Sequence, residues 1–84
     1  MMLQKRAAFY ICTRNQNESV GIFYTRLKRA SENCLFGAYI SDMLRDRLVL
    51  ESYNTEAKRK ILRIVEVTLE IALSKLQSYE TVEL

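Results

Sequence analysis

Apolar side chains between residues 20 and 34 recur at steps of three, four, three and four residues. That spacing follows the period of an α-helix, so these side chains share one helical face. Charged residues of the same segment, Arg26 and Lys28 among them, fall off this face. An amphipathic helix needs a cover for its apolar side, so we expect the rest of the chain to pack against it. The apolar residues of this face are Val20, Phe23, Leu27, Ala30 and Cys34.

Helix boundaries are marked here by Asn, Ser and Thr, because the chain has no proline and only two glycines. Asn15 and Glu18 have the spacing of a capping box, which predicts that the first long helix begins there. Gly37 suits a helix stop that needs a positive φ. The next helix is expected to begin at Tyr39–Ile40 or at Ser41 and to run to about Leu50.

Two further helices are expected in the second half of the chain. Asn54 or Thr55 caps the first of them and Thr68 caps the last, because short polar side chains satisfy free backbone N–H groups at helix starts. Glu56 and Lys60 have the spacing of an ion pair on an exposed helix side. The apolar side of the third helix is predicted to carry Ala57, Ile61, Ile64 and Val65.

These helices predict an all-α fold, a compact bundle of four to five short helices. The 84 residues are enough for one domain rather than two, with a lead-in at 1–14, a helical core at 15–80 and a frayed tail at 81–84. The lead-in stays open, because Ala7-Ala8 favours helix and 9–13 favours an extended run. Beyond the first apolar face, the predicted core residues are Leu48, Ile61, Leu69, Ala72 and Leu73.

The helix expected from about Ile40 to Leu50 carries more apolar residues than one narrow stripe can hold. At about 100° per residue they spread over more than one face. One face can serve the core, which leaves a second for a partner. The apolar residues are Ile40, Met43, Leu44, Leu48, Val49 and Leu50.

The composition argues against catalysis. The chain has no histidine, which excludes serine–histidine and cysteine–histidine nucleophile pairs, and its two cysteines cannot complete a four-ligand zinc site. No glycine-rich phosphate loop is present. Asp42 and Asp46 lie four residues apart on a helix, which is typical of a solvated face. We therefore expect no enzyme activity, no cofactor, no metal and no small-molecule substrate.

The same composition bears on compartment and on membranes. No run of residues approaches the roughly 20 apolar positions needed to span a bilayer. Two scattered thiols without a secretory segment favour a reduced, cytoplasmic setting. The net charge of +3 is mild and lacks a contiguous basic run, so we expect no nucleic-acid binding by this domain alone.

Ordered motifs cover about residues 9–78. They are Gln16 to Leu27 with Glu-Ser-Val at 18–20, Cys34-Leu-Phe-Gly37, Leu44-Arg-Asp-Arg-Leu-Val49, Lys60-Ile-Leu62, and Thr68 to Leu73. In order and spacing they resemble the Gag capsid region of Ty3/Gypsy-type retrotransposons. The resemblance implies the C-terminal domain of a capsid, similar to that of retroviral capsids, which self-associates during particle assembly.

The first of these motifs is also similar to the major homology region of retroviral capsids. There a Gln, a Glu and an Arg join a turn to the following helix by buried hydrogen bonds. The resemblance implies such a network for Gln16, Glu18 and Arg26. Glu18 and Arg26 keep the family's spacing, whereas Arg14 stands where the retroviral Gln would be. The alternative is a surface ion pair worth about 0–1 kcal/mol.

Residues 48–58 also look like the end of the retroviral dimerisation helix and the start of its successor. This likeness places Met43 and Leu44 where retroviral capsids make apolar dimer contacts. The alternative is that both are ordinary core residues, as a Met at helical spacing often is. The predicted homodimer interface comprises Ile40, Met43, Leu44 and Arg47.

Two other functions compete with self-association in a capsid lattice. A domesticated Gag-derived module could present a groove to a partner's helix or strand. A small helical nucleic-acid-binding domain could use its basic residues instead. Those residues would be Arg26, Lys28, Arg29, Arg45 and Arg47.

Overall fold

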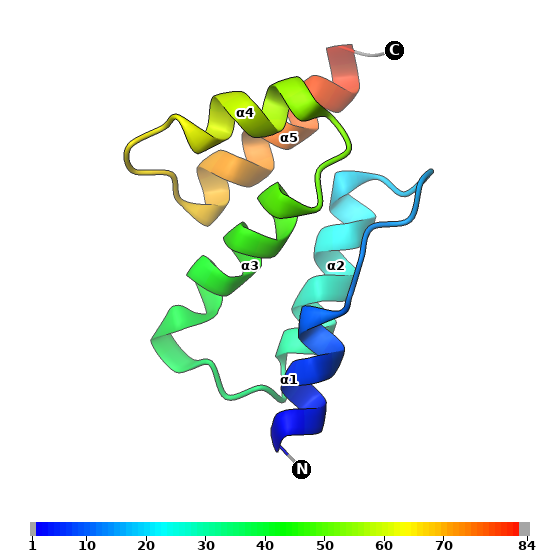
Figure 1. Ribbon diagram of the computed structural model, residues 1–84, viewed down its shortest axis with the longest axis vertical. Coiled ribbons are helices and arrows are strands. Elements are labelled where there is room, and N and C mark those ends of the chain that lie inside the picture. Colours follow the sequence, from blue (N-terminus) through cyan, green and yellow to red (C-terminus); the bar gives the residue numbers. More distant parts are fainter. Residues whose placement is uncertain (1, 83–84) are drawn as a thin grey trace.

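The computed structural model describes residues 2–82, and these fold as the predicted all-α bundle (Figure 1). No strand occurs within that range. A single 3₁₀ turn, η1 (Gly37–Tyr39), leads directly into the third helix. The α-helices are α1 (Met2–Tyr10), α2 (Val20–Ser31), α3 (Ile40–Leu50), α4 (Thr55–Leu62) and α5 (Leu69–Val82).

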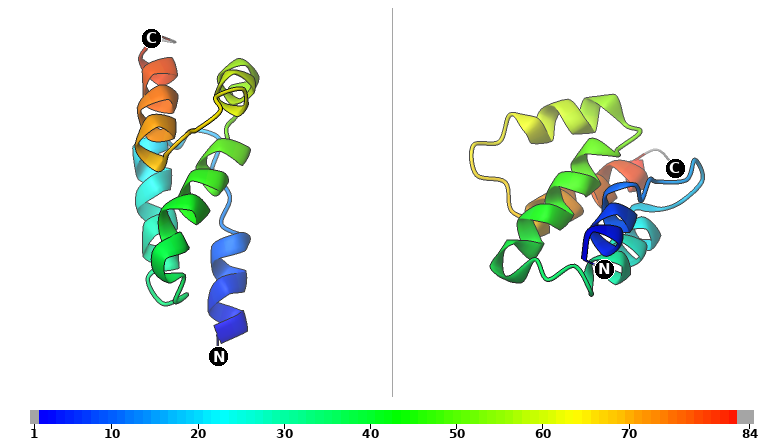
Figure 2. Two further views of the ribbon diagram at one scale, coloured as in Figure 1. Left: turned by 90° about the vertical axis from the view of Figure 1, so that its left-hand side faces the viewer. Right: turned by 60° about the horizontal axis from the view of Figure 1, so that its bottom comes forward.

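Helix α3 lies at the centre of the packing and contacts α2, α4 and α5. Helix α1 packs on α2, and α4 packs on α5, so the bundle has one helix pair toward each end (Figures 1 and 2). The two ends of the chain lie at opposite ends of a flattened body of about 41 × 29 × 16 Å. None of the helices in residues 2–82 is long and apolar enough to cross a membrane.

Helix α2 begins later than the capping-box pattern predicts. Asn15 and Glu18 do interact, since the Asn15 amide donates to the Glu18 carboxylate at 3.0 Å, but they form a turn that precedes the helix. Ser19 is the N-cap, and its hydroxyl accepts from the Ile22 amide at 3.2 Å. The two caps predicted further along are confirmed: Asn54 accepts from Ala57 and Thr68 from Ile71.

The helix ends agree only in part with those that the sequence predicts. Gly37 has a φ of +59°, as its place after the first long helix predicts. Helix α4 stops at Leu62, however, so the apolar side predicted to continue through Ile64 to Val65 is interrupted. Val65 is 96% exposed instead of buried.

The core forms where the helical faces meet. Eight of the ten predicted core residues are buried, and Ala30 and Leu73 pack against them while partly buried. Five further residues complete the core, namely Phe9, Leu44, Val49, Ala57 and Leu76. The eight buried residues are Val20, Phe23, Leu27, Cys34, Leu48, Ile61, Leu69 and Ala72.

The lead-in is helical from Met2 to Tyr10 and is not helical at residues 11–14. The helical part is anchored to the rest of the chain. Phe9 of α1 is fully buried and meets the ring of Phe36 edge-on at 5.1 Å. Arg6 donates from Nε to the Cys34 carbonyl at 2.9 Å. At the other end α5 continues to Val82, so the tail expected from residue 81 begins as helix, and residues 83 and 84 lie outside the described residues.

Candidate functional site

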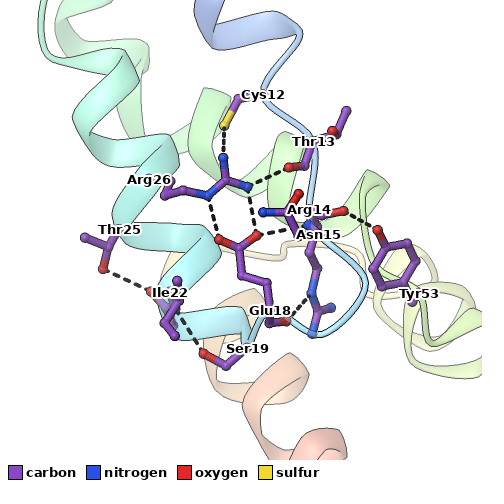
Figure 3. Close-up of polar contacts among 11 residues, drawn as sticks. Cys12, Thr13, Arg14, Asn15, Glu18, Ser19, Ile22, Thr25, Arg26 and Tyr53 are labelled. Atoms are coloured by element: carbon purple, nitrogen blue, oxygen red, sulfur yellow. Dashed lines mark hydrogen bonds and ion pairs between the residues drawn. The ribbon is translucent and has the colours of Figure 1, made fainter.

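An ion pair with a buried carboxylate joins the turn at residues 15–19 to helix α2 (Figure 3). Arg26 donates from Nε and Nη2 to the two carboxylate oxygens of Glu18, at 2.5 and 2.8 Å. The Glu18 side chain is only 6% exposed, whereas that of Arg26 is 40% exposed. The bidentate geometry and the buried carboxylate make this a stronger contact than a surface ion pair. The predicted association of Glu18 with Arg26 is therefore present.

The remaining donors of Arg26 hold the segment that connects α1 to the turn. Nη2 also donates to the Thr13 carbonyl at 2.7 Å, and Nη1 lies 3.7 Å from the Cys12 sulfur (Figure 3). The guanidinium also packs over the Phe23 ring, 5.7 Å from its centroid. One side chain on α2 thus fixes the path of the chain on both sides of the turn.

These contacts govern the charge state of the pair. The hydrogen bonds from Arg26 lower the pKa of Glu18, and the Asn15 amide adds to this, while burial of the carboxylate opposes it. The hydrogen bonds to Glu18 correspondingly raise the pKa of Arg26. Both groups are therefore held in their charged forms at neutral pH.

Arg14 and Glu80 extend this arrangement to the last helix. Arg14 donates from Nε to the Glu18 carbonyl at 3.0 Å and from Nη2 to the Glu80 carboxylate at 2.8 Å. The same carboxylate oxygen accepts from the Val20 amide at 2.6 Å, so it caps the first turn of α2. We call Arg14, Glu18, Arg26 and Glu80 the α2 junction.

Sequence reasoning identified only half of the α2 junction. Gln16 is exposed and its side chain makes no hydrogen bond to any residue in the range 2–82. Arg14, which stands where the retroviral glutamine would be, makes the contacts to the turn instead. Its backbone carbonyl also accepts a hydrogen bond from the Tyr53 hydroxyl. The position of Arg14 in the motif was a signal for its role, whereas nothing local pointed to Glu80.

The four residues predicted for a dimer interface do not share one surface. Leu44 is only 3% exposed within a single chain and belongs to the core, because the side of α3 on which it lies packs against the bundle. Arg47 is directed inward, where it donates to the Cys12 carbonyl and to Glu51, both at 3.0 Å. Ile40 and Met43 stay partly exposed.

Tyr39 borders these two residues and is 71% exposed. It immediately precedes α3, and positions four apart on a helical backbone are neighbours, so Tyr39 adjoins Met43. The sequence pattern predicts Tyr39 at the start of this helix but gives no sign that its side chain lies on the surface. We call Tyr39, Ile40 and Met43 the Tyr39 face.

The basic residues considered for nucleic-acid binding are mostly used within the chain. Arg26 and Arg47 bind carboxylates as described, and Arg45 pairs with Asp46 at 2.9 Å. Lys28 and Arg29 remain exposed on α2. The structure does not gather the set on one open surface.

A groove of about 730 Å³ lies between α3, the end of α4, the connection at 65–68 and the start of α5. Val49 and Ile61 are buried beneath it, while Leu50 and Leu62 are exposed beside it. Within residues 2–82 no cluster of cysteine and carboxylate side chains is arranged to hold a metal ion.

Comparison with known proteins gives no relative for this chain. No protein-family model, no curated protein and no solved structure matches it.

Proposed function

We propose that this chain is a non-catalytic self-association domain of the kind found in the C-terminal half of a Gag capsid, and that two copies pair through the Tyr39 face. The observation that carries the proposal is the exposure of Tyr39 beside the partly buried Met43. Aromatic and methionine side chains are enriched at the centres of protein interfaces. A helix face that crosses its own copy satisfies the self-complementarity of a twofold dimer.

The capsid kinship in this proposal is supported by the α2 junction. The Glu18–Arg26 pair is bidentate and its carboxylate is buried, as the resemblance to the major homology region implies. A small domain gains from such a network, because it buries only about 60–65% of its unfolded surface and has little stability to spare. The same shortage of buried surface favours association.

Sedimentation equilibrium over a concentration series from about 10 µM to about 1 mM tests the proposal. We expect a reversible dimer whose dissociation constant rises about tenfold or more in Tyr39→Asp, because a charge is placed at the centre of an apolar contact. Tyr39 is mostly exposed, so this change leaves the helical content intact.

Ile22→Asp is the matched control. Ile22 is also an exposed apolar residue, but it lies in the first turn of α2, at the opposite end of that helix from η1. The dimer should persist in this variant with its dissociation constant unchanged. A wild-type chain that stays monomeric throughout the series, or equal losses in the two variants, refutes pairing through the Tyr39 face.

A further inference from the structure

The groove between α3, α4 and α5 has an apolar interior that the single chain leaves open to solvent. Leu50, Leu62 and Val65 are 52%, 61% and 96% exposed along it. Large aliphatic side chains exposed around one concave site favour a docking surface over random surface scatter. The Tyr39 face is separate, because none of its three residues lines the groove.

The groove wall is held in place before any partner arrives. Arg45 on α3 donates from Nη1 to the Val67 carbonyl at 3.1 Å, which ties the connection between α4 and α5 to α3. The same guanidinium lies between Asp42 and Asp46, at 3.4 and 2.9 Å. A partner would therefore meet a preformed site, which reduces the entropy lost on binding.

The charge of the groove is opposite to that of the whole chain. Its lining includes four carboxylates and one guanidinium, a formal balance of −4 + 1 = −3, whereas the chain carries +3. Arg45 forms ion pairs with Asp42 and Asp46. Glu66 and Glu70 form no ion pair with any residue in the range 2–82, so their charge remains available at the edge of the groove.

We propose that this groove binds a basic amphipathic helix of another protein. Apolar side chains at i, i+3, i+4 and i+7 of that helix would contact Leu50, Leu62 and Val65, as in other helix-in-groove complexes. Lysine and arginine on its flanks would pair with Glu66 and Glu70. The acidic rim repels phosphate, which opposes a nucleic-acid or anionic-membrane partner at this site.

Fluorescence anisotropy with a labelled model peptide tests this proposal on the whole chain. The probe is an alanine-based helix of about 15 residues with leucine at the four spaced positions and lysine on both flanks. We expect saturable binding to the wild type, weakened about tenfold or more when glutamate replaces the flanking lysines. A third peptide keeps the basic composition and disperses the leucines around the helix, and it should bind about tenfold more weakly.

Charge reversal in the protein provides the matched comparison. Glu66→Lys/Glu70→Lys should weaken binding of the basic peptide about tenfold and strengthen binding of the acidic one. Glu32→Lys/Glu56→Lys changes the net charge equally at exposed positions outside the groove and should leave both affinities near wild type. Val65→Asp, at the most exposed apolar position, should also weaken binding of the basic peptide.

Several results would overturn the proposal. They are no saturation by the basic peptide below about 1 mM, equal losses in the two charge-reversed proteins, and equal affinity for the peptide with dispersed leucines. Loss of self-association in Glu66→Lys/Glu70→Lys would assign the groove to a second copy of this chain. Sedimentation and anisotropy are separate measurements, so failure of dimerisation through the Tyr39 face leaves this test intact.

Discussion

The α2 junction and the Tyr39 face lie at opposite ends of α2 and differ in how far their side chains are engaged by contacts within the chain. In the α2 junction the carboxylates of Glu18 and Glu80 each accept more than one hydrogen bond from the same chain. At the Tyr39 face an aromatic ring stands in solvent with no comparable cover. The polar groups of the α2 junction are used in contacts that stabilise the fold. The Tyr39 face leaves apolar surface exposed, where another molecule can bind.

This contrast separates residues that stabilise the fold from residues that could form an interface, which the sequence pattern alone does not distinguish. Arg47 and Leu44 were predicted for the interface together with Ile40 and Met43, yet both serve the fold of a single chain. Stability and association should therefore respond to different substitutions.

Leu44→Ala should have the largest effect. Removing a buried leucine side chain leaves a cavity, and we expect the free energy of unfolding to fall by about 3 kcal/mol. Urea denaturation followed by circular dichroism measures this. Tyr39→Ala, at an exposed position of the same region, should change it by about 0.5 kcal/mol or less. A neutral Leu44→Ala that nevertheless lost self-association would return Leu44 to the interface.

The Glu18–Arg26 pair should show an asymmetric effect. Arg26→Met leaves a carboxylate that is almost fully buried, and we expect a loss of about 2–3 kcal/mol. Glu18→Gln leaves a guanidinium that still reaches water, so the loss should be about 1–2 kcal/mol. Lys60→Met, which removes the exposed pair with Glu56, is the control and should have the smallest effect of the three, because solvent screens an exposed pair. Equal small losses of unfolding free energy in all three variants would show that the Glu18–Arg26 pair stabilises the fold no more than a surface ion pair does.

The same pair predicts how stability depends on pH. Because Arg26 lowers the pKa of Glu18 in the folded chain, the stabilisation is fully present above the unfolded pKa of about 4.3 and is lost as the pH falls through the folded value. The difference in unfolding free energy between the wild type and Glu18→Gln should therefore shrink below about pH 4.3. Denaturation curves at several pH values measure that difference. A constant difference down to pH 2 would contradict the assigned cause of the shift.

The parts of this structure that sequence could predict are those with a local pattern. The apolar face from Val20 to Cys34 gave buried residues because helix periodicity fixes which side chains share a side. The start of α2 was misplaced because Asn15 and Glu18 make their contact in a turn, where the same spacing serves a different hydrogen-bond pattern.

Long-range contacts account for what was missed. Glu80 reaches Arg14 and Val20 across more than half of the chain, and no local spacing encodes that approach. Leu44 and Met43 are adjacent apolar residues, and only the position of α2 and α5 decides which one is buried. The pair Glu18–Arg26 was predicted because both residues lie within one motif.

Glu80→Gln tests the long-range part of the α2 junction. The substitution keeps an oxygen for the Val20 amide but removes the charge that faces Arg14, so we expect a loss of about 1 kcal/mol. Glu70→Gln, on the same helix and without an ion pair in the described chain, should lose about 0.5 kcal/mol or less. Equal values for the two variants would show that the contact with Arg14 adds nothing to stability.

The smallest effect should come from Gln16→Ala. This variant tests whether the turn is held by Gln16, as the motif implies, or by Arg14, as the structure shows. Gln16 is exposed and unbonded within residues 2–82, so the free energy of unfolding should change by about 0.5 kcal/mol or less. Arg14→Ala should lose about 1–2 kcal/mol, because Arg14 contacts both the Glu18 carbonyl and Glu80. Urea denaturation of both variants under one condition makes the comparison. A larger loss of unfolding free energy in Gln16→Ala than in Arg14→Ala would mean that Gln16, and not Arg14, holds the turn in solution.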